Sequence, residues 1–420
     1  TEIYTLSLHD ALPISANITG KVHNTVASLT GAACLVLTHI LSIEDCVDAV
    51  DVETICILVG MMLLVAVIKN SGIFEYIAIK AAKIAKGRPW PIMVIFIFIT
   101  AVCSGMLDNV TTVLLVGPMT LAITNILKVD PVPYIITQIM ASNIGGTATL
   151  IGDPPNIMIG SAAKLSFVDF ILNTGVATVF VIIVGLICMY FIYGRKLFVT
   201  DESIVKVMQL DENKAIKDRK LMHESVIVII LVALCFIFHD QLGVQSCTVA
   251  IAAACIMLLI GGQEPEEIIA DVEWPTILFF IGLFIVVGGM KKVGVITMLA
   301  NGLISITHGN MVVTMMVILW VSAIVSSFLD NIPFVATLIP MILTMQSEGM
   351  DVTPIWWALS LGACLGGNGT LIGASANVVL SGISKNNGHP ITFGQYFKIG
   401  FPMMILSIIV CSVFLLIRFA

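Results

Sequence analysis

Residues 145–156 read G-G-T-A-T-L-I-G-D-P-P-N, and residues 366–377 read G-G-N-G-T-L-I-G-A-S-A-N. The offset between the two stretches is 221 throughout, since 366 − 145 and 377 − 156 give the same number. Both lie in strongly apolar sequence, yet their glycines, threonines and asparagines suit an unbroken membrane helix poorly. Backbone that leaves the helical path at membrane depth persists only where protein or a water-filled cavity pairs its free polar groups. The sequence therefore predicts two copies of one plan, each with an interrupted membrane span.

The composition predicts a polytopic membrane protein whose surroundings are the lipid bilayer. Hydrophobic residues make up 58% of the 420 residues, charged residues 11%, and the mean hydropathy is +1.05. Soluble domains carry about 25% charged residues, so this chain has more apolar surface than a soluble core would bury. No patch suited to nucleic acid is present. The ten cysteines contain no C-x-x-C pair, so we expect neither disulfides nor a zinc site, and no resident cofactor.

Further markers repeat at nearly the same offset and divide the chain. The triplet D-V-E at residues 51–53 recurs at 271–273, and the pair D-N at 108–109 recurs at 330–331. We therefore assign residues 20–194 to a first repeat, 195–222 to a polar cytoplasmic linker and 223–420 to a second repeat. Residues 1–15 resemble translated sequencing-adapter sequence and are interpreted as non-native. An apolar span at 225–238 has no partner before residue 25, which predicts a further N-terminal helix in the natural protein.

The order of apolar spans predicts an inverted arrangement of the two repeats. Spans are expected at 25–43, 55–68 and 167–193, an amphipathic interfacial helix around 73–84, and two arms at 92–106 and 110–127 that form either a re-entrant hairpin or two crossings. Placing the basic segments 69–88 and 195–220 in the cytoplasm makes the second repeat start from the opposite side to the first. The predicted fold is an all-α polytopic membrane protein with inverted-topology repeats, each holding a re-entrant helical hairpin and a broken transmembrane helix.

The two hairpin tips are the first candidate binding residues: Asp108, Asn109, Asp330 and Asn331. An Asp at the centre of a membrane helix costs roughly 2.5 to 3.5 kcal/mol on insertion scales, so ionisable groups there mark function by default. The alternative is that each Asp caps the helix that follows it. The two roles are compatible, because a capping oxygen can also face a cavity.

The interrupted spans supply the second set of candidates: Thr149, Gly152, Asn156, Thr370, Gly373 and Asn377. Half-helix N-termini attract anions and exposed carbonyl ends attract cations, so such a break suits a small ion of either sign. The alternative is close helix packing through small residues. Packing accounts for the paired glycines but not for the paired asparagines.

Asp153 is the candidate coupling residue. It stands in the first break where the second has Ala374, and a driving proton or cation needs a titratable group on one side of the site. Pro154 and Pro155 after it fit the first turn of a helix. The alternative is that Asp153 is only the N-cap before these prolines.

At these residues the chain resembles the ion transporter superfamily, in the branch of arsenite-efflux permeases, sodium–proton antiporters and the P protein. The matching stretches are residues 107–112, 141–157 and their second-half echoes. The resemblance implies a secondary active transporter of a small inorganic ion (arsenite or antimonite efflux, or sodium–proton antiport), with Na⁺ or H⁺ as coupling ion, usually as a homodimer. It also implies a multi-pass protein of a bacterial or archaeal plasma membrane.

The distant citrate and dicarboxylate carriers of that superfamily are the alternative, with a small anion as substrate. They have Ser-Asn-Thr at the hairpin tips, whereas this chain has Asp-Asn at both tips. Two acids would repel an anion unless they were protonated or cation-bound.

Two rivals come from other classes. An intramembrane aspartyl protease would use Asp108 and Asp153 as a catalytic pair, but Asp108 has a symmetry mate in Asp330 that a protease does not need. We therefore assign no catalytic residue. A channel would conduct without saturable coupling, whereas inverted repeats suit alternating access.

Overall fold

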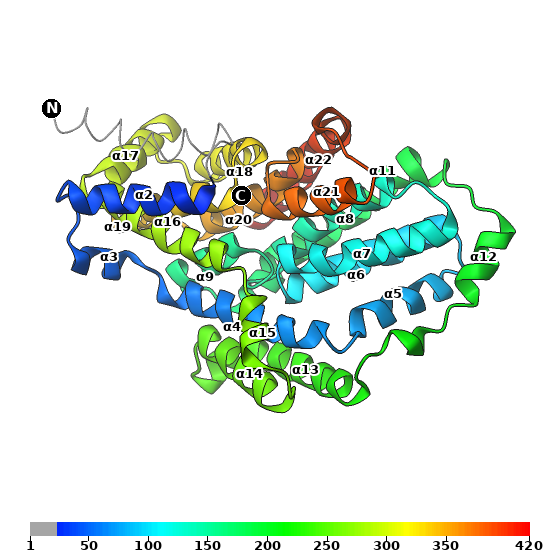
Figure 1. Cartoon of the computed structure of the whole chain (residues 1–420). Coiled ribbons are helices and arrows are strands. Elements are labelled where there is room, and N and C mark those ends of the chain that lie inside the picture. Colours follow the sequence, from blue (N-terminus) through cyan, green and yellow to red (C-terminus); the bar gives the residue numbers. More distant parts are fainter. Residues whose placement is uncertain (1–22) are drawn as a thin grey trace.

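The computed structural model describes residues 23–420, apart from the side chains of residues 239, 240 and 242. Every regular element in this range is a helix, which confirms the predicted all-α fold (Figure 1). Eight of the described helices are long and apolar enough to cross a membrane. The interpretation of residues 1–15 and the expected extra N-terminal helix lie outside the described residues.

The helices of the second half repeat those of the first in order. The first half contains α2 (Asn24–Leu37), α3 (Ile43–Ala49), α4 (Val52–Lys69), α5 (Ile73–Ile84), α6 (Pro89–Met106), α7 (Asn109–Leu127), α8 (Val132–Thr147), α9 (Pro154–Ala163), α10 (Phe167–Phe170), η1 (Ile171–Gly175), α11 (Val176–Met189) and η2 (Tyr190–Gly194). After α12 (Asp201–Met208) and η3 (Glu212–Ala215) come α13 (Arg219–Leu242), α14 (Ser246–Ile260), α15 (Pro265–Ala270), α16 (Trp274–Lys292), α17 (Val295–Thr307), α18 (Met311–Phe328), α19 (Asn331–Ser347), α20 (Thr353–Gly366), η4 (Gly367–Gly369), α21 (Ser375–Asn386) and α22 (Phe393–Phe419). Thus α2 to α9 correspond to α14 to α21.

Two boundaries differ from the sequence prediction. α2 ends at Leu37 rather than at residue 43, because the chain turns at His39, whose φ of 58° is left-handed. A separate helix, α3, follows, and its start is closed by reciprocal bonds between Ser42 and Asp45. α13 starts at Arg219, inside the segment assigned to the linker, and continues to Leu242.

The helices form two groups that each contain both repeats. In the scaffold bundle (α2, α4, α13, α14 and α16), α4 packs against α14 and α16 against α2. In the hairpin bundle (α6 to α9 and α18 to α21), α6 packs against α8, α18 against α20, α7 against α21 and α19 against α9 (Figure 1). The equivalent glycines Gly60 and Gly282 allow the scaffold contacts, since a Cβ at either position would lie 2.7 Å from backbone carbon of the facing helix.

α6 and α7 form a helical hairpin. Its two outer ends lie together, because Ile92 near the start of α6 and Leu127 at the end of α7 share one buried cluster with Tyr134. The Tyr134 hydroxyl donates to the Pro89 carbonyl at 2.9 Å. The tip between the arms is buried in protein, with Asp108 5% exposed and Asn109 4% exposed.

Ion pairs at the ends of α4 and α16 show that these equivalent helices are antiparallel, as an inverted topology requires. Lys69 at the end of α4 pairs at 2.7 Å with Asp271, which precedes α16, so the end of one helix lies beside the start of the other. Lys292 at the end of α16 pairs at 2.6 Å with Asp45 of α3, which precedes α4. The Lys292 ammonium holds the pKa of the Asp45 carboxyl at about 2 through this hydrogen bond. The equivalent helices α4 and α16 therefore run in opposite directions.

The linker lies on the face that carries the end of α4. Lys83 of α5 pairs with Glu212, and the backbone N–H of Lys217 donates to the Ser71 carbonyl at 3.0 Å. The basic segment, the linker and the loop at Asp271 thus share one face, as the sequence predicts.

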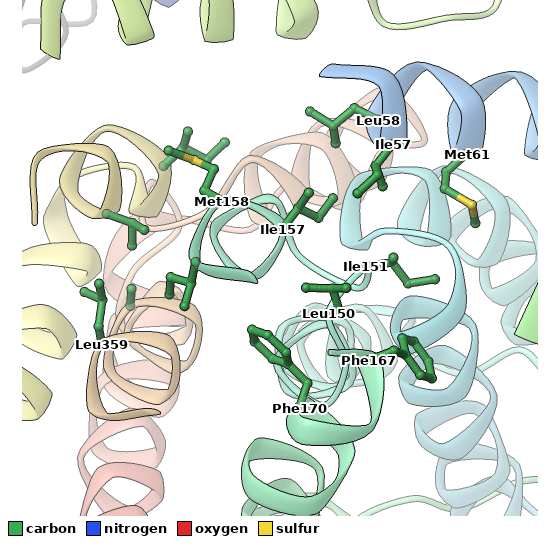
Figure 2. Close-up of a cluster of buried hydrophobic side chains, with 14 of the residues drawn as sticks. Ile57, Leu58, Met61, Leu150, Ile151, Ile157, Met158, Phe167, Phe170 and Leu359 are labelled. Atoms are coloured by element: carbon green, nitrogen blue, oxygen red, sulfur yellow. The ribbon is translucent and has the colours of Figure 1, made fainter. Parts of the chain in front are cut away.

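The two bundles meet asymmetrically. In Figure 2, α4 side chains lie over α9 and over the break that precedes it, in the largest buried apolar cluster of the described chain. The residues labelled there include Ile57, Leu58, Met61, Leu150, Ile151, Ile157 and Met158. Among the described residues no comparable packing joins the equivalent pair, α16 and α21.

Candidate functional site

Both hairpin tips place their Asp at a helix N-cap. Asp108 precedes α7, and its Oδ1 accepts from the Thr111 N–H at 2.8 Å. Asp330 precedes α19, and its Oδ1 accepts from the Ile332 N–H at 3.2 Å. Both carboxylates therefore cap the helix after the tip, as the simpler interpretation of the sequence expects. Asp330 also accepts from the Ser375 hydroxyl at 3.2 Å, which ties the second tip to the second break.

Thr149 and Thr370 fasten each broken helix to the neighbouring hairpin arm. The Thr149 hydroxyl donates to the Gly105 carbonyl at 2.5 Å and accepts from the Gly152 N–H at 3.1 Å. The Thr370 hydroxyl makes the equivalent bond to the Ser327 carbonyl and accepts from the Ile372 N–H. Each threonine thus satisfies backbone groups that the interrupted helix leaves free.

Gly152 and Gly373 let the backbone of each break approach its hairpin arm closely. A Cβ on Gly152 would lie 2.7 Å from the carbonyl oxygens of Gly146 and Ser104. A Cβ on Gly373 would lie 2.8 Å from the carbonyl oxygen of Gly367 and 2.9 Å from that of Ser326. Only glycine fits either position without moving backbone.

Asn156 and Asn377 hold the breaks together from inside. The Asn156 Nδ2 donates to three carbonyls of the first break, with the shortest bond, 2.9 Å, to Thr149. The Asn377 Nδ2 donates to the carbonyls of Gly367 and Thr370 at 2.7 and 2.8 Å. Both side chains are 0% exposed. These amides therefore replace the hydrogen bonds that an intact helix would make.

The oxygens of the same two amides join one repeat to the other. The Asn156 Oδ1 accepts from the Ser360 hydroxyl of α20 at 2.6 Å and from the Cys364 thiol at 3.5 Å. The Asn377 Oδ1 accepts from Asn143 Nδ2 of α8 at 2.9 Å. Cys364 and Asn143 are equivalent positions, because 364 − 143 is again 221. The two broken helices are thus cross-linked by pseudo-symmetric bonds.

Asp153 links the two hairpin tips. Its Oδ1 accepts from Asn109 Nδ2 at 3.2 Å, and its Oδ2 accepts from Asn331 Nδ2 at 3.2 Å. The side chain is 1% exposed. A carboxylate from the first break is therefore the common acceptor for one amide of each repeat.

Asp153 occupies the N-cap position of α9 that the alternative interpretation expects, but its side chain does not cap the helix. Pro154 and Pro155 lack N–H groups, and the Asn156 N–H bonds to the Asp153 backbone carbonyl at 2.9 Å. A cap normally uses the second or third N–H of the helix, so here the carboxylate is left to face the tips.

Four residues that the sequence did not single out as binding residues complete this network: Asn143, Ser360, Cys364 and Asn368. The 221-residue offset aligns Asn143 with Cys364 and Asn368 with Thr147. The available signal for these residues was a polar residue in one repeat aligned with a different residue type in the other repeat. Cys364, which the sequence suggests is a small buried residue, is 0% exposed.

The electrostatics of the site come from acids and amides. The ion pairs found among residues 23–420 all lie elsewhere, and none includes Asp108, Asp153 or Asp330. Within the same range, no three His, Cys, Asp or Glu side chains gather in a way that would hold a metal ion. The arrangement offers one shared carboxylate with amide donors on both sides.

Comparison with known proteins identifies the family. The family model described as citrate transporter matches residues 15–362. The chain belongs to the citrate transporter family. An uncharacterized transporter of Mycobacterium tuberculosis is 41% identical over 407 residues, covering 95% of this chain and 94% of that protein. The 46 kDa membrane protein of Mycobacterium leprae is 38% identical over 406 residues, with 95% of each chain covered.

A more distant relative and a solved structure agree with this membership. The human P protein is 31% identical over 481 residues, covering 94% of this chain and 57% of that protein. The crystal structure of the Alcanivorax borkumensis YdaH transporter matches with a TM-score of 0.52 at 15% identity, covering 86% of this chain and 83% of that one. The protein is a multi-pass membrane transporter, and the family consists of transporters and not enzymes. This family membership argues against the intramembrane aspartyl protease.

Proposed function

We propose that the protein is a secondary active transporter that moves a small inorganic ion by alternating access, with Asp153 as the coupling residue. The observation that carries this proposal is the acceptance by Asp153 of amide bonds from Asn109 of one hairpin and Asn331 of the other. Hairpin tips and broken helices are where such folds bind substrate and coupling ions. The proposed site comprises these three residues with Asp108 and Asp330 and the break residues Thr149, Gly152, Asn156, Thr370, Gly373 and Asn377.

The charge of Asp153 gives the coupling a physical basis. Hydrogen bonds to an ionised group contribute about 1.5–3 kcal/mol, against about 0.5–1.5 kcal/mol for neutral partners. Protonation of Asp153, or its binding of Na⁺, would weaken the bonds from Asn109 and Asn331. The two hairpins would then be held less tightly to each other, so the state of one carboxylate would change the geometry of both repeats.

The charge of the site favours some candidate substrates over others. Arsenite or antimonite efflux and sodium–proton antiport suit a site with three buried or half-buried carboxylates and no basic partner among the described residues. A citrate or dicarboxylate carrier is the second candidate, favoured by the description of the matching family. A free tricarboxylate would meet like charges at Asp108, Asp153 and Asp330, so it would need protonation or accompanying cations.

The setting of the transporter is also proposed. We assign it to a bacterial plasma membrane, as a homodimer, with the face that carries Lys69, Lys83 and the linker in the cytoplasm. The positive charges on that face follow the rule that short cytoplasmic loops are rich in Lys and Arg.

Reconstitution in lipid vesicles tests the function. Purified protein is supplied in parallel with arsenite, with sodium under an imposed proton gradient, and with citrate, and uptake or release is followed over time. We expect saturable transport of one inorganic ion that depends on the proton or sodium gradient. Saturable citrate transport alone would favour the second candidate, and gradient-independent conductance would refute secondary transport.

A further inference from the structure

Two equivalent helices, α5 and α17, connect the scaffold bundle to the hairpins. α5 follows α4 of the scaffold and precedes α6, and α17 follows α16 and precedes α18. Each begins after a glycine with left-handed backbone, Gly72 (φ 81°) or Gly294 (φ 82°), and is followed by another, Gly87 or Gly309. The offset is 222 for both pairs, since 294 − 72 and 309 − 87 give the same number. Residues at the ends of elements are where hinge motions concentrate.

The polar linker covers both ends of α5. At the start, a Cβ on Gly72 would lie 2.1 Å from the carbonyl oxygen of Ala215 in η3. At the end, a Cβ on Gly87 would lie 3.0 Å from Ile204 Cγ2 of α12. A turn of the backbone at either glycine would therefore displace the linker.

The linker also holds the middle of α5 and joins it to the first hairpin. Lys83 Nζ donates to Glu212 Oε2 at 2.5 Å and to the Leu210 carbonyl at 3.2 Å. Val207 of α12 is 0% exposed and shares one buried cluster with Ala82 of α5 and Leu127 of α7. α12 thus packs on both the connecting helix and the hairpin (Figure 1).

The far end of the linker is attached to the scaffold bundle. The Lys217 N–H donates to the carbonyl of Ser71, just after α4, at 3.0 Å. α13 of the scaffold bundle then begins at Arg219. Residues 201–217, which we call the brace, therefore contact the hairpin at one end and the scaffold at the other.

α17 has no equivalent support among the described residues. Apart from chain neighbours, no atom in that range lies within 4 Å of a Cβ built on Gly294 or Gly309. The offset of 222 aligns Lys83 with Ser305, a short and exposed side chain on α17. The two connecting helices are therefore equivalent in position but unequal in restraint.

We propose that the brace is a conformational device that holds α5 in place, and that its release speeds the change between the two arrangements of the bundles. Both connecting helices have to reorient when the bundles shift, so the restrained one sets the rate. α5 turns at Gly72 or Gly87 only after the contacts with Ala215 or Ile204 are lost, whereas α17 meets no such barrier. The inference rests on the proposed alternating access and goes beyond it, because it assigns the slow step to the linker and not to the binding site.

Two substitutions weaken the brace without touching the proposed site. Lys83→Gln removes the ion pair between α5 and the brace, and Ile204→Ala removes the side chain that covers the end of α5. The matched control is Lys206→Gln. Lys206 pairs with Glu202 at the same 2.5 Å, but both side chains are exposed and lie within α12.

The first measurement is amide hydrogen exchange of the full-length purified protein, followed by mass spectrometry in peptides that cover 73–84 and 295–307. Exchange rates give the ease of local opening. We expect α5 to exchange more slowly than α17 in the wild type and in Lys206→Gln. Lys83→Gln alone should speed α5 by only about two- to threefold, because partly exposed ion pairs are weak. The double variant with Ile204→Ala should speed it by about tenfold and leave α17 unchanged.

The second measurement is transport by the same proteins in vesicles. We expect the maximal rate of the double variant to rise by about threefold or more, because conformational steps limit many turnover rates. The substrate concentration that gives half the maximal rate should stay unchanged, since the site residues are intact. Thermal unfolding of each variant shows whether the fold is retained.

The outcomes separate this inference from the proposed function. Slow exchange of α5 in a folded double variant would overturn the inference, and so would an equal rise in α5, α7 and α17, which would show a general loss of stability. Faster exchange of α5 without a higher maximal rate would refute the assignment of the slow step to the brace. If the vesicles transport none of the candidate substrates, the proposed function fails, whereas faster exchange confined to α5 still supports the brace.

Discussion

Replacement of Asp153 by Asn is the sharpest test of the coupling proposal. The variant keeps the shape of the side chain but offers one oxygen and one NH₂ group. Asp153 accepts from Asn109 and from Asn331, so in Asp153→Asn one of these amides faces another donor. Losing a hydrogen bond to an ionised group costs about 1.5–3 kcal/mol, which lowers the population of the bridged tips by roughly 10- to 150-fold.

The assay is transport by reconstituted vesicles with a proton or sodium gradient imposed in either direction. We expect Asp153→Asn to lose accumulation against the substrate gradient, while exchange without a driving gradient continues. The control is Asp130→Asn, which neutralises an exposed carboxylate that accepts from the Val132 N–H at the start of α8. If Asp153→Asn still accumulates substrate with wild-type dependence on pH and sodium, the carboxylate does not couple, and coupling belongs to Asp108 or Asp330.

Three further outcomes follow from the packing. Gly145→Ala should destabilise the fold by about 3 kcal/mol or more, because the new Cβ would lie 2.1 Å from the Ala101 carbonyl oxygen. The control is Gly185→Ala, whose Cβ would meet only Met403 Cε at 3.9 Å and should leave the melting temperature in detergent unchanged or raised. Asn377→Ala should reduce both folded yield and transport, since it removes the amide donor from two buried carbonyls, of which that of Thr370 keeps the Gly373 N–H, and an unpaired buried carbonyl costs about 1–3 kcal/mol. Asn387→Ala, which changes an exposed amide, should reduce neither. Single cysteines introduced at Lys80, Lys214 and Asp271 should resist an impermeant thiol reagent added outside intact cells, and labelling at one of them alone would contradict their common face.

The fold was predictable because its main features repeat. One internal offset aligns both breaks, both tips and the acidic segments, and a helix-breaking sequence in an apolar span has few structural solutions in lipid. The end of α2 was not predictable in the same way. The apolar run continues past Leu37, and only the turn at His39 stops the helix.

The site was predictable in its residues but not in its connections. The asparagines of the breaks were identified from the repeat, yet their partners lie far away in sequence, as with Asn156 and Ser360. Such contacts leave no local pattern. The two prolines after Asp153 remove the N–H groups of the first two helical positions. The Asn156 N–H remains, and its bond to the Asp153 backbone carbonyl rather than to the side chain could not be predicted from the sequence.

Under the proposed transport function, the contrast between the breaks would give the two repeats different tasks. Two identical breaks would carry the same titratable groups, so both would change charge under the same conditions. Here the carboxylate of Asp153 accepts from both tips, whereas its equivalent, Ala374, cannot accept a side-chain bond at all. The contacts with the scaffold bundle are also unequal, since α4 packs on α9 without comparable packing of α16 on α21 among the described residues. Inverted repeats that occupy unequal environments imply a second arrangement in which the environments are exchanged. In that arrangement we expect α16 to pack on α21, and the bundle that carries Asp153 to face the opposite side of the membrane.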